Sequence, residues 1–168
     1  MAIDPAYALG SGPVQSEKEM EGQSTDSVIG VRRYVAEYTR RRLHQTAFRE
    51  SVIQAYSSRC SLCSLKHREL LDAAHILGDT HPKGDPIVPN GLCLCKIHHA
   101  AFDQNIVGVS PEYTIHVRRD VLEEIDGPML LHGLQELHQK TLTVPVRKRD
   151  WPDPERLEIR YKEFLQAG

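Results

Sequence analysis

The sequence predicts an α+β fold in which a small strand–loop–strand–helix core is flanked by helices at both ends. Three observations predict it. Apolar residues recur at helical spacing within 26–56 and again within 152–165. Between them, short apolar pieces separated by turn residues fill 60–103, and all four cysteines fall in this stretch. With 168 residues, of which 40% are apolar, the chain has about the size of one domain with a tail.

We expect four regions along the chain. Residues 1–25 are rich in small, polar and turn-forming residues without periodicity, and we interpret them as a disordered leader. A helical segment then covers 26–58, and a core that holds the metal ligands covers 59–110. A strand and helix extension that packs on this core covers 111–168.

Bulk properties exclude some classes of protein. No run of eighteen apolar residues exists and the N-terminus lacks a signal pattern, so we expect no membrane span and a cytoplasmic location. The formal net charge of -2 gives no global reason to expect a polyanionic partner. Any role with nucleic acid must therefore depend on local patches and on the chemistry of a site.

Two helices are predicted before the core. Asp26 can cap the first, and the second covers 45–56 with an apolar face formed by Phe48, Val52, Ile53 and Tyr56. Several arginines accompany them, and they fit either a solvated helix face or a stripe that contacts phosphates: Arg32, Arg33, Arg40, Arg41 and Arg42.

The core is predicted as strand, loop, strand and helix. The strands cover 70–77 and 92–95, and prolines with Gly84 mark a loop over 78–90. A helix begins at Lys96 and continues to about Phe102.

Four shorter elements are predicted after the core. An exposed strand covers 113–117, a short helix or turn covers 121–124, and 126–138 is helical after Pro128. We assign Met129 and the apolar stretch 130–134 to the core. A terminal helix covers 152–165, with a predicted buried face of Leu157, Tyr161, Phe164 and Leu165.

The cysteines predict a structural zinc site. Cys60 and Cys63 form a C-x-x-C knuckle, and Cys95 with His98 forms a C-x-x-H knuckle about thirty residues later. Two such pairs supply the four ligands of a tetrahedral, closed zinc site, which holds shape and performs no chemistry. Cys93 lies on the same face of the strand and is a competing ligand, but only Cys95 has the histidine partner.

A second constellation remains after zinc binding is assigned. His75 follows a short apolar strand, Asn90 opens the next strand, and His99 and Asp103 lie at i, i+4 on the following helix. A histidine base, an amide that orients it and two metal ligands are the parts of a one-metal phosphodiesterase. Histidine titrates near neutral pH, and Mg²⁺ or Mn²⁺ bound by few protein ligands leaves room for phosphate and water.

The stretch from Tyr56 to Asp103 resembles HNH endonucleases, in the branch found in modification-dependent restriction enzymes. Its motif residues are YSSRCSLC, LLDAAHI and VPNGLCLCKIHHAAFD, and weaker similarity extends from Arg33 to the C-terminus. The resemblance implies a ββα-metal fold and metal-dependent cleavage of DNA. It makes His75 the general base, Asn90 its orienting residue, and His99 and Asp103 ligands of the catalytic ion.

One position departs from the family. The residue before the base often binds the metal as well, and here it is Ala74. Asp72 lies on the same side of an extended strand and is a further candidate ligand, directly or through water. The alternative is that Asp72 only fixes the local turn or pairs with a basic residue.

The expected partner is duplex DNA, read by a separate domain outside this chain, and a two-fold homodimer would suit double-strand cleavage. Two other functions stay open: a zinc-containing DNA-binding module that has lost catalysis, and a structural zinc domain that mediates homodimerisation. The candidates for contact with DNA phosphates are Arg59, Lys66, Lys96, Arg118 and Arg119.

Overall fold

A helix over residues 42–55 opens the part of the chain that the computed structural model describes, which is residues 42–167. Its predicted apolar face is confirmed, because Phe48, Val52, Ile53 and Tyr56 are all buried. The expected leader over 1–25 and the first predicted helix lie outside the described residues.

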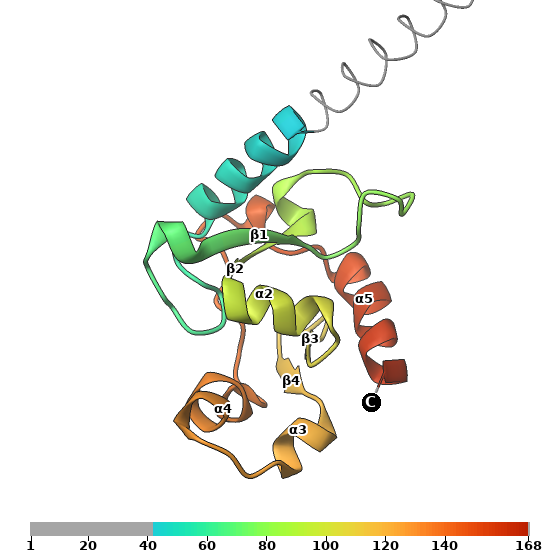
Figure 1. The fold of residues 1–168 in the computed structure, drawn as a ribbon. Coiled ribbons are helices and arrows are strands. Elements are labelled where there is room, and N and C mark those ends of the chain that lie inside the picture. Colours follow the sequence, from blue (N-terminus) through green and yellow to red (C-terminus); the bar gives the residue numbers. More distant parts are fainter. Residues whose placement is uncertain (1–41, 168) are drawn as a thin grey trace, which may run out of the picture. The chain divides into compact units, whose positions relative to one another are not determined.

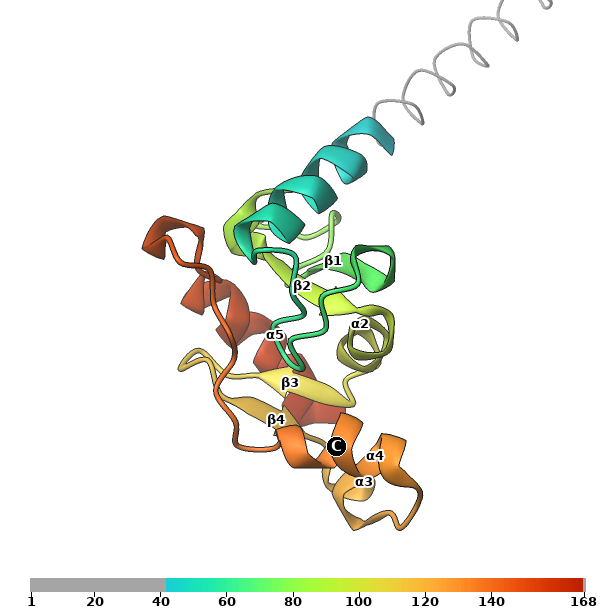
Figure 2. The same ribbon diagram turned by 90° about the vertical axis from the view of Figure 1, so that its left-hand side faces the viewer.

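The predicted strand–loop–strand–helix order is present in the core. β1 (Leu71–His75) pairs antiparallel with β2 (Gly91–Cys95), so that His75 lies opposite Gly91. α2 (Lys96–Asp103) follows β2 without a linker. The helix over 42–55 and α2 lie on opposite sides of this hairpin (Figure 1, Figure 2). One-turn 3-10 helices precede each strand, at Arg68–Leu70 and Val88–Asn90.

Gly91 allows the helix over 42–55 to approach β2 closely. A Cβ atom at this position would lie 2.5 Å from Cγ2 of Val52 and 2.9 Å from Cζ of Phe48. Both distances are too short for carbon atoms in contact. A glycine here therefore seats the helix directly over the end of the hairpin, where His75 is located.

A second hairpin follows the core. β3 (Val107–Val109) pairs antiparallel with β4 (Ile115–Val117). The strand over 113–117 was expected to be exposed, but Ile115 and Val117 are buried and only the alternation was correct. Its partner β3 was not predicted, because three residues are too short to show a period. Gly108 lies against the ring of Phe164, so the C-terminal helix packs on this hairpin.

The helical stretch predicted over 126–138 is interrupted. After α3 (Arg119–Glu123), α4 (Pro128–Gly133) ends before Leu134, and a 3-10 turn follows at Gln135–Leu137. Met129 and Leu131 are 65% and 44% exposed, so their assignment to the core was wrong. Leu130 and Leu134 are partly buried and pack against the core.

The terminal helix α5 (Pro154–Ala167) is present as predicted, after a 3-10 turn at Lys148–Asp150. Leu157 and Phe164 are buried, but Leu165 is 57% exposed and was wrongly placed on the buried face. Its Cβ points about 100° around the helix from that of Phe164. Neither α5 nor any other helix within residues 42–167 is long and apolar enough to cross a membrane.

Candidate active site and metal centre

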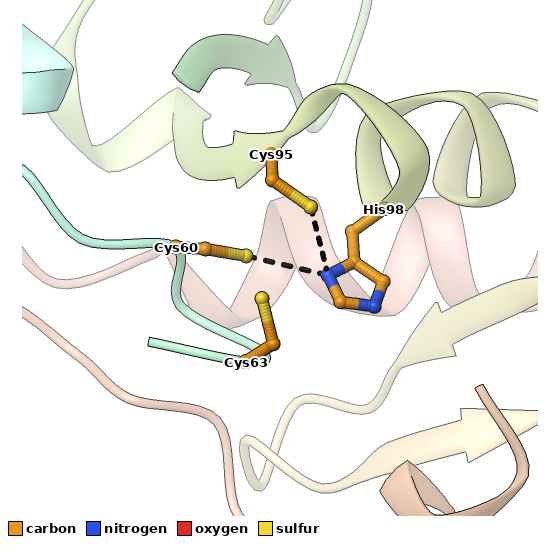
Figure 3. Close-up of side chains that lie close together, drawn as sticks. All are labelled: Cys60, Cys63, Cys95 and His98. Atoms are coloured by element: carbon orange, nitrogen blue, oxygen red, sulfur yellow. Dashed lines mark hydrogen bonds between the residues drawn. The ribbon is translucent and has the colours of Figure 1, made fainter. Parts of the chain in front are cut away.

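Four metal-binding side chains meet where β2 passes into α2. Cys95 ends the strand, His98 lies in the first turn of α2, and Cys60 and Cys63 reach them from the turn that follows the helix over 42–55. One ligand atom from each of the four lies within 4.8 Å of every other. Figure 3 shows the Cys60–Cys63 pair and the Cys95–His98 pair directed toward one another. The structure therefore brings together the predicted set, which could hold a zinc ion, and leaves Cys93 out of it.

The arrangement of His98 fits such an ion. Its Nδ1 lies 3.4 Å from Sγ of Cys60 and 3.3 Å from Sγ of Cys95. Ligands of one tetrahedral zinc are roughly 3.5 Å apart, given its bond lengths to sulfur and nitrogen. The other nitrogen, Nε2, lies 2.7 Å from the carbonyl oxygen of Gly133 and can donate to it. This bond fixes the ring with Nδ1 directed at the thiols, as carbonyl partners of metal-binding histidines do.

Electrostatics in the cluster favour thiolates beside an imidazolium. Hydrogen bonding to Cys60 and Cys63 lowers the pKa of Cys95 far below its ordinary value. Burial opposes the charged form of His98, but hydrogen bonds with Cys60 and Cys95 raise its pKa to about 10. A cation that binds Nδ1 must displace this proton, so metal binding at the cluster depends on pH.

His75 ends β1 in a half-buried position. Its ring stacks on Phe48, with centroids 4.0 Å apart and planes at 20°. Nε2 is buried without a hydrogen-bond partner among the described residues, and the nearest carboxylate oxygen, Oδ1 of Asp79, is 3.4 Å away. Burial lowers the pKa of His75, although the charge of Asp79 acts in the opposite direction. The imidazole is therefore neutral near neutral pH, as a general base must be.

Asn90 is fully buried and bonds to the backbone around the base. Its Oδ1 accepts from the backbone N–H of Leu77 at 3.0 Å, and its Nδ2 donates to the carbonyl oxygens of Leu77 and Asp85. The backbone carbonyl of Asn90 also accepts from Ile76. Asn90 was expected to orient the base by bonding across the strand pair, and its bonds to backbone groups hold the segment that follows His75.

His99 lies between two carboxylates, one at each ring nitrogen. Nε2 lies 3.4 Å from Oδ2 of Asp103, and Nδ1 lies 3.6 Å from Oδ2 of Asp72. The same Asp72 oxygen is 2.9 Å from Nζ of Lys96, and the other oxygen is 3.3 Å from Nε of Arg49. Of the two readings of Asp72, the geometry shows pairing with basic residues.

Two hollows meet at the two histidines. The first, of about 550 Å³, is lined by His75, His99 and Asp103. The loop after β1 bounds it on one side, and Arg160 and Glu163 of α5 also line it. The second, of about 410 Å³, contains His75, His99 and Asp72 and is bounded by the helix over 42–55. The predicted base and metal ligands therefore come together on one open surface.

The predicted phosphate contacts are less closely grouped. Lys96 is paired with Asp72 beside His99. Arg118 and Arg119 pair with Asp120 and Glu123 on α3, and neither of them lines either hollow. Arg59 and Lys66 are exposed and also lie outside both linings.

Several residues of the site were not singled out from the sequence. Phe48, Asp79 and Arg49 contact the predicted residues from other elements. Arg160 of α5 donates to the carbonyl oxygen of Phe102 at 2.7 Å and lies over its ring, beside Asp103. For Asp79, its position four residues after His75 could have indicated the contact from the sequence. The contacts of Phe48, Arg49 and Arg160 join elements far apart in the sequence and could be found only from the tertiary structure.

The core of the chain is similar to known nucleases. Residues 60–110 match the HNH endonuclease family. Among solved structures, the chain is similar to a modification-dependent TagI restriction endonuclease at 17% identity and a TM-score of 0.46. That similarity covers 70% of this chain and 37% of the other, and no curated protein matches. The matched segment, from Cys60 to Ser110, contains the mixed helices and the small sheet of the core and is similar to HNH nucleases.

Proposed function

We propose that this protein is a metal-dependent DNA endonuclease that hydrolyses phosphodiester bonds, with a structural zinc beside its active site. The observation that carries the proposal is the meeting of His75 and His99 on one open surface, each from a different element of the HNH domain. One ring is neutral and lacks a hydrogen-bond partner at Nε2 among the described residues, and the other has a carboxylate at each nitrogen. These are the roles of a base and a metal ligand.

His75 would act as the general base. Its Nε2 is buried against Asp79, so we assign the ring N–H to this atom, which leaves Nδ1 as the basic nitrogen. Nδ1 would take a proton from the attacking water, and Asp79 would stabilise the imidazolium that forms. Asn90 contributes by fixing the backbone after His75, so that the ring keeps its place on Phe48.

His99 and Asp103 would hold the catalytic ion. An imidazole nitrogen with one carboxylate fits Mn²⁺ or Mg²⁺, which would stabilise charge on the phosphate. Asp72 is committed to Lys96 and Arg49, and a second cation on its oxygens would lie beside the ammonium group. We therefore assign Asp72 a positioning role, in which its carboxylate, 3.6 Å from Nδ1 of His99, would attract the N–H at that atom and direct Nε2 at the ion.

The substrate that we propose is duplex DNA, with modified bases read by another domain, as in a restriction system. The support is the HNH family match together with the helices of residues 42–167, none of which is a long basic recognition helix. Pairing of two copies would place two such sites on the two strands.

Ala74 favours a second candidate, a zinc-containing DNA-binding module with weakened catalysis. Its methyl group is fully buried and cannot ligate an ion, although this position often carries a ligand in the resembling family. Such a module would retain DNA without cutting it.

Cleavage of supercoiled plasmid tests the proposal. The protein should nick or linearise methylated or unmodified DNA with Mg²⁺ or Mn²⁺ and not with EDTA. His75→Ala should lower the rate by about 10²- to 10⁴-fold, the usual contribution of a general base. His132→Ala is the matched control, because this histidine is exposed on α4 and pairs with Glu136 of the following 3-10 turn. Full activity of His75→Ala would show that His75 is not the general base. Binding of DNA without cleavage by the wild-type protein would favour the DNA-binding module with weakened catalysis.

A further inference from the structure

One face of the helix over 42–55 is directed at the catalytic histidines. Arg42, Gln45, Thr46 and Arg49 recur at i, i+3, i+4 and i+7, and all four line the hollow of about 410 Å³. A neighbouring face, which includes Phe48 and Val52, is buried in the core. The core therefore anchors this helix, and its polar stripe has a fixed position relative to His75.

The two hollows carry opposite charge. With the histidines counted as neutral, the first hollow has a formal charge of -1, from the carboxylates of Asp103 and Glu163 and the guanidinium of Arg160. The second has a formal charge of +1, from Arg42, Arg49 and Asp72. Because His75 and His99 line both, the two hollows adjoin at the site of chemistry. The acidic hollow suits a divalent cation, whereas the basic one suits a phosphate.

The two arginines of the stripe differ in exposure. Arg49 donates to the carbonyl oxygen of Leu71 at 2.7 Å and pairs with Asp72, so it links the helix over 42–55 to β1 at the hollow. Arg42 is exposed at the outer end of the same stripe. Seven residues of helix separate the two by roughly 10 Å along the axis. At an axial rise of about 3.4 Å per base pair of duplex, this distance corresponds to two or three base-pair steps.

We propose that Arg42 binds a backbone phosphate two or three nucleotides from the scissile one, so that the DNA strand runs along the helix over 42–55 into the site. The inference rests on the proposed function and names where its substrate lies. It assigns Arg42 to the phosphate-contacting stripe, one of the two readings that the sequence left open. It also adds a contact outside Cys60–Ser110, the segment that matches the family.

Binding without cleavage tests this path. Fluorescence anisotropy of a labelled duplex in buffer without added Mg²⁺ or Mn²⁺, with every variant built on His75→Ala, separates affinity from chemistry. Arg42→Gln should weaken binding by roughly three- to tenfold at low salt and reduce the slope of log K against log salt by about one. Arg42→Lys should restore the slope, because the contact needs only a positive charge. Lys140→Gln removes the same charge from an exposed position outside both hollows and should change neither quantity.

The outcomes separate the inference from the proposed function. Wild-type affinity and salt slope in Arg42→Gln would overturn the path along the helix, and so would an equal loss in Lys140→Gln. The proposed function fails by a different result, which is a wild-type protein that leaves plasmid uncut with either ion. A loss of affinity confined to Arg42→Gln and reversed in Arg42→Lys supports the inference.

Discussion

The imidazole of His75 lies on the phenyl ring of Phe48, with ring centroids 4.0 Å apart. Phe48 belongs to a helix outside the segment that matches the HNH family, and it is buried against Gly91 on the neighbouring strand. The position of the proposed base therefore depends on a helix that precedes the segment of residues 60–110 that matches the family. This dependence can be tested apart from general stability.

Phe48→Leu should lower the cleavage rate more than its effect on folding explains. Leucine keeps most of the apolar volume, so we expect a cost of less than about 1.5 kcal/mol in the free energy of unfolding. It removes the flat surface that orients His75. Ile53→Val is the matched control, since it costs about 0.5–1.5 kcal/mol in the same core without facing His75. Denaturant unfolding and single-turnover cleavage measure the two effects, and equal rates in both variants would contradict an orienting role.

The pH dependence of cleavage should follow the neutral form of His75. Burial lowers the pKa of His75 below 6.5, so the active fraction rises with pH and is half-maximal below that value. The charge of Asp79 raises this pKa, and Asp79→Asn should move the acidic limb to still lower pH. Single-turnover rates between about pH 5 and pH 8 report the shift. Asp126→Asn, at an exposed carboxylate on the segment before α4, should leave the limb in place, and an unmoved limb in Asp79→Asn would exclude this coupling.

Arg156 of α5 should hold the loop over 78–90 that forms one wall of the acidic hollow. Its guanidinium donates to the carbonyl oxygen of Lys83 at 2.9 Å and lies 3.6 Å from Oδ2 of Asp85. Arg156→Gln should cost about 1.5–3 kcal/mol of local stability, the usual value for hydrogen bonds of charged groups. Hydrogen exchange should then accelerate at the amide of Gly84 and not in β2.

Lys162→Gln is the control for this experiment, because Lys162 is exposed on the same helix and pairs only with Glu158 among the described residues. Unchanged exchange in the loop of Arg156→Gln would show that other contacts hold it.

Cys95→Ala should abolish zinc binding, whereas Cys93→Ala should retain it. Both cysteines lie on β2 and both are buried, but only Cys95 has its sulfur within the four-ligand cluster. Loss of a ligand should also lower the melting temperature, because binding free energy at a structural zinc site contributes to folding. Metal analysis of the purified variants measures zinc per chain. A zinc-free Cys93→Ala protein with a zinc-loaded Cys95→Ala protein would reverse the ligand assignment.

The sequence predicted the core well because its signals are local. The C-x-x-C and C-x-x-H spacings predicted the four residues that the structure brings together, and short apolar pieces between proline-rich turns predicted β1, β2 and α2. Features that depend on tertiary contact were missed. β3 is three residues long with Gly108 at its centre, and only the packing of Phe164 explains that residue.

The catalytic residues show the same limit. The i, i+4 spacing predicted that His99 and Asp103 lie together. For Asp72 the sequence left pairing with a basic residue open, but it did not indicate that Lys96 and Arg49 are the partners. For Asn90 the sequence indicated an orienting role but not its partners, which are the backbone groups of Leu77 and Asp85. In both cases the partner comes from a separate element or loop, which periodicity does not report.

The central claim is that the adjacent histidines His98 and His99 serve different ions. His98 directs Nδ1 at Cys60 and Cys95, and His99 directs Nε2 at Asp103. Zinc content per chain, measured by mass spectrometry of the purified His98→Ala and His99→Ala proteins, tests this most directly. The account predicts that His99→Ala retains one zinc ion per chain and that His98→Ala loses it. Loss of zinc in His99→Ala, or its full retention in His98→Ala, would contradict the division of the two sites.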